Sequence, residues 1–223
     1  MNHSAVEFDH VSLRYRILAE RGINSFKEWA IRWMTRQMSY QELVALSDVS
    51  FTVPVGHAVG IIGHNGAGKS TLLRVAAGIL RPTEGTAVVR GRQAPVIELG
   101  LGFEAELSGR ENIFFNGARL GRSPAEMEDR LEEIVQFADL HAFIDQPIRT
   151  YSTGMVARLA FAVATTVDAH ILLLDEVLAV GDASFRLKCR ERLETFRDDG
   201  VTILLVSHDL EAVELMCDDV LWL

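Results

Sequence analysis

The residues with the clearest chemistry form a glycine-rich run, GHNGAGKST, at positions 63–71. Glycines let backbone N–H groups approach a phosphate, and the start of a helix favours an anion. A lysine in such a run reaches the β- and γ-phosphates, and the next hydroxyl reaches Mg²⁺. We therefore predict a P-loop that binds a nucleoside triphosphate and Mg²⁺. Its residues are His64, Asn65, Gly66, Ala67, Gly68, Lys69, Ser70 and Thr71, with Ser70 on the metal.

The residues around this run have the pattern that a P-loop needs. Residues 58–62 (AVGII) are apolar and β-branched, which is typical of a buried parallel strand. Residues 69–77 follow with helical spacing and no helix breaker. A strand, a glycine loop and a helix in succession favour a phosphate site over a glycine-rich turn with a chance lysine.

An acidic pair follows a second buried strand. Residues 171–174 (ILLL) are apolar, and Asp175 and Glu176 come directly after them. P-loop proteins hold Mg²⁺ with an acid at the end of such a strand. We predict that Asp175 supports the metal through water and that Glu176 polarises the attacking water. The alternative is an acidic strand cap, and the P-loop upstream argues against it.

Three further residues stand where a phosphate could bind. His208 follows an apolar strand predicted at 202–206 and could donate to the γ-phosphate, although a lone histidine there is more often structural. Ser152 and Gly154 open a helix predicted at 153–167, so they could cap it or bind an anion. Capping and anion binding are compatible, and both interpretations stay open.

Buried strands alternate with helices along most of the chain. This alternation predicts an α/β fold, a P-loop NTPase with a mostly parallel sheet and an antiparallel β edge. The stretch at about 104–168 is helical and predicts an inserted subdomain, in which Ser123, Pro124 and Glu126 mark a helix start. Further strands are expected at 6–8, 11–15, 49–53, 86–90 and 95–99, and further helices at 182–197 and 210–216.

Composition bounds the remaining possibilities. A chain of 223 residues holds one or two domains, and its net charge of −9 argues against nucleic acid as a partner. Cys189 and Cys217 lack metal spacing and are expected to be ordinary thiols. The sequence has no signal peptide and no apolar run of ~20 residues. If the protein works at a membrane, other chains are expected to span it.

In their order and spacing, these motifs resemble the nucleotide-binding domain of an ABC transporter. The resemblance covers nearly the whole chain and implies an ATPase whose ATP is sandwiched in a head-to-tail dimer. It implies that Ser152 and Gly154 contact the γ-phosphate held by the partner's Lys69, and that Asp182 lies in a loop coupling the two sites. Tyr15 resembles the aromatic residue that stacks on adenine, the alternative being a strand-edge tyrosine.

Two departures from the general family pattern are informative. The usual signature Leu-Ser-Gly-Gly-Gln is replaced by YSTGM at 151–155, and residues 100–112 contain no glutamine for the metal. Gln93 lies too early, so that ligand stays unassigned. The altered signature resembles the branch that exports O-antigen, teichoic acid and capsule. This branch implies membrane permeases as partners, lipid-linked glycans as cargo and a place at the cytoplasmic face of the membrane.

Residues 16–44 have a character of their own. Ser25 and Glu28 form a capping box, after which apolar and basic residues occupy different faces of a helix. The apolar face includes Trp29 and Trp33, which suits a membrane interface or a partner groove, while packing against the chain's own core is the alternative. A similar insertion occurs in O-antigen and teichoic-acid exporters. The end at 219–223 resembles a strand just beginning, so we expect a truncated C-terminus.

Two rival functions remain open on the sequence. One is an ABC transporter for drugs, lipids or small solutes, against which the altered signature and the insertion argue. The other is an ABC ATPase that acts on ribosomes or DNA without transport. Such relatives usually carry two nucleotide-binding domains or a long coiled coil, and this sequence shows neither.

Overall fold

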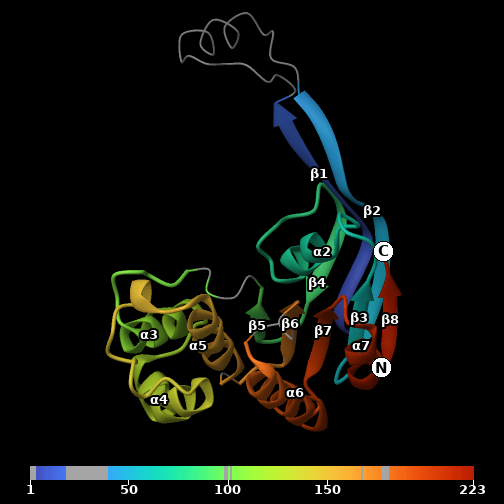
Figure 1. Ribbon diagram of the computed structural model, residues 1–223. Coiled ribbons are helices and arrows are strands. Elements are labelled where there is room, and N and C mark those ends of the chain that lie inside the picture. The colour runs from blue at the N-terminus through green and yellow to red at the C-terminus, as the bar shows by residue number, and fades with distance from the viewer. Residues whose placement is uncertain (1–3, 19–39, 98–99, 101, 167, 177–180) are drawn as a thin grey trace, which may run out of the picture.

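The structure is a computed structural model that describes residues 4–18, 40–97, 100, 102–166, 168–176 and 181–223. Two lobes are visible, one built on strands and one on helices (Figure 1). We call them the sheet lobe and the helical lobe. The helical lobe consists of α3, α4 and α5, and the sheet lobe holds both sheets and the other helices.

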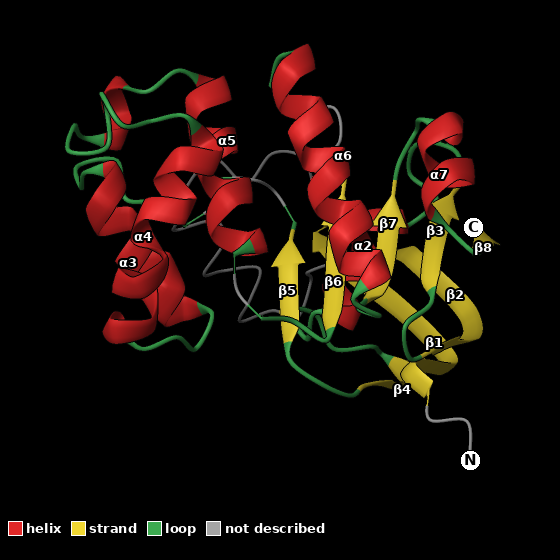
Figure 2. Cartoon of the chain, turned by 90° about the horizontal axis from the view of Figure 1, so that it is seen from below, coloured by secondary structure: helices red, strands yellow, loops and turns green. Residues whose placement is uncertain are grey.

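A parallel sheet of five strands organises the sheet lobe. Its order is β5-β6-β7-β3-β8, and Figure 2 shows β5, β6, β7 and β3 side by side. The register pairs Asp175 at the end of β6 with Val206 at the end of β7, and Ile61 near the end of β3 with the same Val206. The residues that follow these three strands therefore emerge together at one edge. The strands are β3 (Ala58–Ile62), β5 (Gln93–Val96), β6 (Ile171–Asp175), β7 (Thr202–Val206) and β8 (Asp219–Trp222).

Both faces of this sheet are covered, which explains why its strands are continuous apolar runs. Alternate strand residues, such as Leu173 and Leu204, pack with α2 (Lys69–Ala76) and the antiparallel sheet. The residues between them, such as Leu172 and Leu205, pack with Phe185 and Val213 from the helices on the other face. These helices are α6 (Ala183–Asp198) and α7 (Leu210–Met216), together with part of α5.

The antiparallel β edge is a separate three-stranded sheet in the order β2-β1-β4. Its strands are β1 (Ser4–Leu18), β2 (Tyr40–Pro54) and β4 (Glu84–Val89). We expected two short strands before residue 16, but β1 is one strand with irregular register, in which His10 has a φ of 51°. The ends of the 16–44 segment thus continue β1 and β2, and the helix predicted within it lies outside the described residues. Likewise β5 ends at Val96, and positions 98–99 of the predicted strand lie outside them.

The helical lobe has its own core of buried side chains, including Ile113, Ile134 and Leu159. Ser123 begins α4 with the predicted capping box, and Ser108 begins α3 in the same way with Glu111. The helices are α3 (Gly109–Arg119), α4 (Pro124–Ala138) and α5 (Thr153–Thr165). Within the described ranges, none of the helices has the length and apolar character needed to cross a bilayer.

A buried amide holds the loop that leads into α3. Asn112 is fully buried, and its Oδ1 accepts a hydrogen bond from the Glu104 backbone N–H at 2.8 Å. Its Nδ2 lies within 3.2 Å of the carbonyl oxygens of Glu104, Leu107 and Ser108. One side chain therefore satisfies backbone groups of a loop that has no regular structure of its own.

Replacing this amide should destabilise the protein. Asn112→Leu keeps a similar volume but leaves buried loop groups without partners, so we expect the free energy of unfolding to fall by about 3 kcal/mol in urea titrations. Asn116→Leu is the matched control, because its Nδ2 is only part-buried and has a single recorded donation, to the Asn112 carbonyl. Equal losses for the two variants would contradict the role given to Asn112.

Candidate functional site

A cavity of about 330 Å³ lies at the carboxyl edge of the parallel sheet. It is bounded by the P-loop, the start of α2, the residues after β6 and β7, and one end of the antiparallel sheet. Its lining residues are Tyr15, Leu43, Val44, Ala45, Asn65, Gly66, Gly68, Lys69, Ser70, Thr71, Glu176 and His208. A larger cavity of about 450 Å³ lies between the helical lobe and β5, but of the residues predicted for the nucleotide site none lines it.

The glycines of the P-loop are required by backbone shape and close packing. Gly63 and Gly68 have φ of 152° and 101°, values that favour glycine. A Cβ on Gly63 would lie 2.6 Å from the Leu223 carbonyl oxygen, and one on Gly68 would overlap the carbonyl oxygen of Ala45. The loop therefore packs against the end of β8 and against β2, which holds its N–H groups in place.

Lys69 is oriented by the loop that it follows. It is 6% exposed, and its Nζ donates to the carbonyl oxygens of Gly63 at 3.0 Å and His64 at 3.1 Å. The ammonium group thus lies across the loop at the N-terminus of α2. The His64 ring stays at the surface, with its Nδ1 2.8 Å from the Asn65 carbonyl oxygen.

Asp175 stands behind this loop at the end of β6. Burial raises the pKa of its carboxyl group, while a hydrogen bond with the Ser70 side chain and the charges of Arg74 and Lys69 oppose that shift. Its Oδ1 is buried and has no hydrogen-bond partner among the described residues. A buried carboxylate oxygen beside a hydroxyl, left without a protein donor, is a ready ligand for a hard cation.

Glu176 and His208 meet at the opening of the cavity. The His208 Nε2 lies 3.0 Å from the Glu176 Oε1, and both side chains are about half exposed. Glu176 has a φ of 53°, which is unusual for a residue other than glycine, and its N–H donates to the Val206 carbonyl at 2.9 Å. This bend turns the chain immediately after β6 and places the carboxylate in the cavity wall. Strained backbone of this kind is concentrated at functional sites.

Tyr15 lines the same cavity, as predicted, but the strand β1 continues beyond it to Leu18. The pairing of Tyr15 with Leu43 brings β2 to the cavity, so Leu43, Val44 and Ala45 are lining residues that sequence reasoning missed. Leu43 and Val44 were assigned to the separate 16–44 segment, and Ala45 lies between that segment and the strand expected at 49–53. The apolar run LVAL at 43–46, leading straight into the strand at 49–53, was the available signal.

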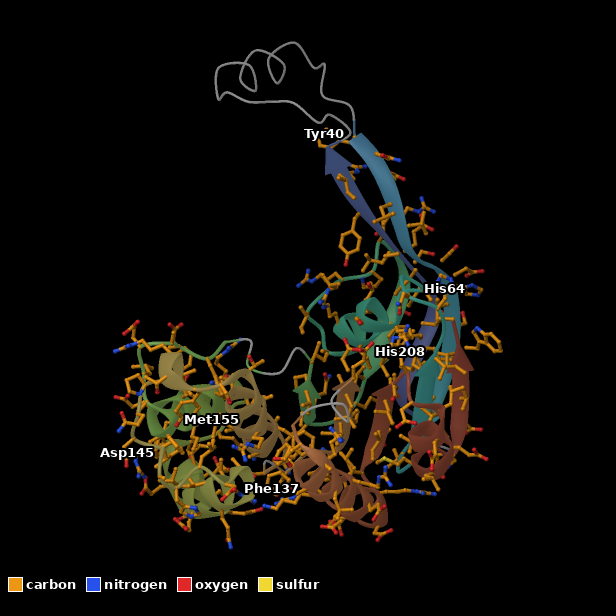
Figure 3. The ribbon with its side chains drawn as sticks, viewed as in Figure 1. Tyr40, His64, Phe137, Asp145, Met155 and His208 are labelled. Atoms are coloured by element: carbon orange, nitrogen blue, oxygen red, sulfur yellow. The ribbon has the colours of Figure 1, made fainter. Side chains whose placement is uncertain are left out.

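Ser152, Gly154 and Asp182 do not line this cavity. Figure 3 shows Met155 on the helical lobe, away from His64 and His208 on the sheet lobe. Ser152 is the N-cap of α5, since its Oγ accepts from the Met155 N–H at 3.2 Å. Asp182 is the N-cap of α6, and its bonds with the Phe185 N–H and the Ser184 hydroxyl hold its pKa below the usual range.

Residues 46–179 match the family model described as ABC transporter. The chain belongs to the ABC transporter family. The matched region begins within β2 and extends past Glu176, so it includes both the P-loop and the acidic pair.

Several relatives of this chain are named as export proteins. The chain is 45% identical over 223 residues to the O-antigen export system ATP-binding protein RfbB of Klebsiella pneumoniae, covering 99% of this chain and 90% of that protein. It is 38% identical to the teichoic acids export ATP-binding protein TagH of Bacillus anthracis, covering all of this chain but 39% of that protein.

Solved structures share the fold at lower sequence identity. The dimeric, post-hydrolysis ATP-binding cassette MJ0796, bound to ADP and Pi, has a TM-score of 0.77 and is 22% identical. The alignment covers 98% of this chain and 94% of that one. The α/β P-loop fold and the family predicted from the sequence are thus confirmed.

The packing of the P-loop yields a test with an internal control. Gly66→Ala must adopt a φ near 84° but meets no atom within 4 Å, so we expect a loss of about 1 kcal/mol in the free energy of unfolding. Gly68→Ala combines a similar φ with overlap on the Ala45 carbonyl, so the expected loss is about 3 kcal/mol. Urea unfolding without nucleotide measures both. A larger loss of unfolding free energy for Gly66→Ala than for Gly68→Ala would contradict the packing described for this loop.

Proposed function

We propose that this chain is the ATP-hydrolysing subunit of an exporter that moves a lipid-linked cell-surface polysaccharide across the cytoplasmic membrane. The observation that carries the chemistry is a single cavity lined by Lys69, Ser70, Glu176 and His208. The cargo class is supported by the exporter names of relatives that match nearly the whole chain. No observation on this chain favours a drug, small-solute or nucleic-acid function over this one.

In this proposal, the P-loop binds the phosphates of ATP. The N–H groups of the loop and of the first turn of α2, whose residues line the cavity, would donate to the β- and γ-phosphates. Lys69 would exchange its two loop carbonyls for phosphate oxygens, a short movement because the carbonyls belong to the same loop. Tyr15, at the far end of the cavity wall, would stack on the adenine.

The residues at the base of the loop fit a magnesium ion. Ser70 would contribute its hydroxyl, and Asp175 would use its unpartnered Oδ1, through water. When bound, the ion would neutralise charge on the β- and γ-phosphates. Gln93 stands at the start of β5, opposite Ile171 at the far edge of the sheet, so it is not a candidate ligand.

Glu176 is our candidate for the general base. A water between its carboxylate and the γ-phosphate would give up a proton to Glu176 as its oxygen bonds to phosphorus and ADP leaves. His208 bonds to the same carboxylate and would hold its orientation, with its ring near the γ-phosphate. The positive φ of Glu176 keeps this carboxylate in the wall of the cavity.

The site is proposed to be completed by a second copy in a head-to-tail dimer. Ser152 and Gly154 would contact the γ-phosphate held by the partner's Lys69, with Asp182 in the loop between the two sites. The packing of Gly154 supports this arrangement. Among the described residues, a Cβ there would meet only the Ser152 Oγ, at 3.9 Å, and its φ is not positive. The described part of the chain therefore does not require glycine at this position, whereas close approach by an external group would.

Dimer closure would then drive permease subunits at the cytoplasmic face of the membrane. We propose that the chain attaches there through the permease, with the 16–44 segment as one contact. The exposed apolar side chain of Ile17, at one described end of that segment, supports a contact of this kind.

Removing the buried carboxylate of Asp175 should have opposite effects on protein stability in the absence and in the presence of Mg²⁺ with ATP. Because burial raises the pKa of Asp175, stability contributed by this group falls as pH rises from 3.8 through the native value and stays low above it. Asp175→Asn should therefore stabilise the free protein at pH 7 and abolish the added stability from Mg²⁺ with ATP. Thermal unfolding checks both. The exposed Asp129→Asn should change neither, and a destabilised free Asp175→Asn protein would refute the argument.

If Glu176 is the general base, its replacement should slow ATP turnover without weakening ATP binding. Glu176→Gln keeps the hydrogen-bonding shape but cannot accept the proton, so we expect ATP affinity within about twofold and turnover reduced at least ~100-fold. Phosphate release and equilibrium binding measure the two quantities. Glu214→Gln, on the exposed face of α7, should behave as the unmodified protein. Undiminished turnover in Glu176→Gln would remove the assignment.

The same variant tests the cargo in cells. With Glu176→Gln as the only copy, the lipid-linked glycan should accumulate on the cytoplasmic side, and mass spectrometry of the membrane fraction would identify it. Normal glycan levels and normal surface display would exclude polysaccharide export while leaving an ABC ATPase.

A further inference from the structure

The residue before the signature serine departs from the usual pattern, and the structure shows what the departure does. Tyr151 stands where leucine is usual, yet its side chain is 9% exposed. Its hydroxyl donates to the Phe143 carbonyl oxygen at 2.7 Å, an oxygen that also accepts from the Gln146 N–H at 2.8 Å. The ring therefore spans from the start of α5 to a neighbouring backbone segment, a reach that leucine does not have.

Room for this hydroxyl is provided by Gly109. A Cβ on Gly109 would overlap the Tyr151 Oη, and it would also lie 3.0 Å from the Ile144 Cδ1 and 3.1 Å from the Ile144 carbonyl oxygen. Gly109 is the first residue of α3, and its φ is not in the left-handed region, so the backbone itself accepts any residue. Glycine is a poor helix residue. Its presence is explained by close packing, most of all against the oxygen of Tyr151 and also against Ile144, rather than by chain conformation.

The segment that Tyr151 reaches is firmly attached to α3. The Gly109 N–H donates to the Gln146 carbonyl at 3.2 Å, and the Arg110 N–H donates to the Ile144 carbonyl at 2.9 Å. The Arg110 guanidinium also pairs with Asp145 at 2.7 Å. Residues 143–148 and the start of α3 thus form one body, and Tyr151 joins the N-terminus of α5 to it.

We propose that Tyr151 is a positioning residue for Ser152, and that Gly109 is the size-matched partner that lets it lie there. The Ser152 side chain is oriented by capping α5, while Tyr151, one residue earlier, fixes where that N-terminus stands. The proposal rests on the proposed role of Ser152 at the partner's γ-phosphate. It adds that the tyrosine of this signature and the glycine of α3 act as a pair.

A double-mutant cycle tests the pairing. Without steric conflict, Gly109→Ala at the start of a helix should stabilise. With Tyr151 in place, we expect it instead to lower Tm by about 5 °C. Tyr151→Phe removes the overlapping oxygen but leaves the contacts with Ile144, so in that background Gly109→Ala should lower Tm clearly less. Equal shifts in the two backgrounds would refute the pairing.

ATP-driven dimerisation tests the positioning role. In the Glu176→Gln protein, adding Tyr151→Phe should weaken the ATP dimer about fivefold, the equivalent of the one hydrogen bond that a displaced Ser152 would no longer make to the partner's phosphate, while ATP affinity of the monomer stays unchanged. Analytical ultracentrifugation and equilibrium nucleotide binding provide the two readouts. The exposed Phe143→Leu keeps the accepting carbonyl and should leave the dimer unaffected.

The outcomes separate this inference from the proposed function. If Glu176→Gln dimerises with ATP and Tyr151→Phe dimerises equally well, the positioning role is wrong and the proposed function stands. If both monomer affinity and dimerisation fall together, Tyr151 is a general stability residue and the inference is also overturned. If Glu176→Gln itself does not dimerise with ATP, the proposal of a site shared between two chains is wrong, and so is the positioning role of Tyr151 that rests on it.

Discussion

Parallel pairing of β6 and β3 with β7 between them is the constraint on which the rest of the site depends. Backbone hydrogen bonds set the register, so the three strands end at one level and deliver the P-loop, the acidic pair and His208 to one edge. A slip by one strand residue would turn every buried side chain to the opposite face of the sheet. Because α2 and the antiparallel sheet pack on one face and α6 and α7 on the other, such a slip would disrupt two cores at once.

The same architecture divides the proposed chemistry between two places. The cavity on the sheet lobe holds the side chains that would bind and hydrolyse ATP, whereas Ser152 and Gly154 stand on the helical lobe, with its separate core. The helical lobe can therefore move as a unit together with Ser152, the N-cap of α5. In the proposed dimer, ATP binding would bring two chains together because each chain would supply only part of the site.

Much of the fold was predictable because its determinants are local. Continuous apolar runs predicted β6 and β7, and the Ser123 capping box predicted the start of α4. The helix α7 has the bounds expected from the sequence. The positions of Lys69, Asp175, Glu176 and His208 followed from strand ends. Contacts between distant segments were not predictable in this way. The pairing of Tyr15 with Leu43, the four backbone partners of Asn112 and the fit of Tyr151 to Gly109 all join residues whose relation no local pattern records.

The fit of Tyr151 to Gly109 limits how signature segments can be exchanged between family members. A chimera that receives leucine at 151 would leave an unfilled space beside Gly109, and a chain with a larger residue at 109 could not accept the tyrosine. The unit that can be transplanted is therefore not the five-residue motif but the motif together with the start of α3. The order of substitution at these two positions therefore matters. Replacing Tyr151 by leucine first leaves a cavity, whereas enlarging Gly109 first creates a clash with the tyrosine.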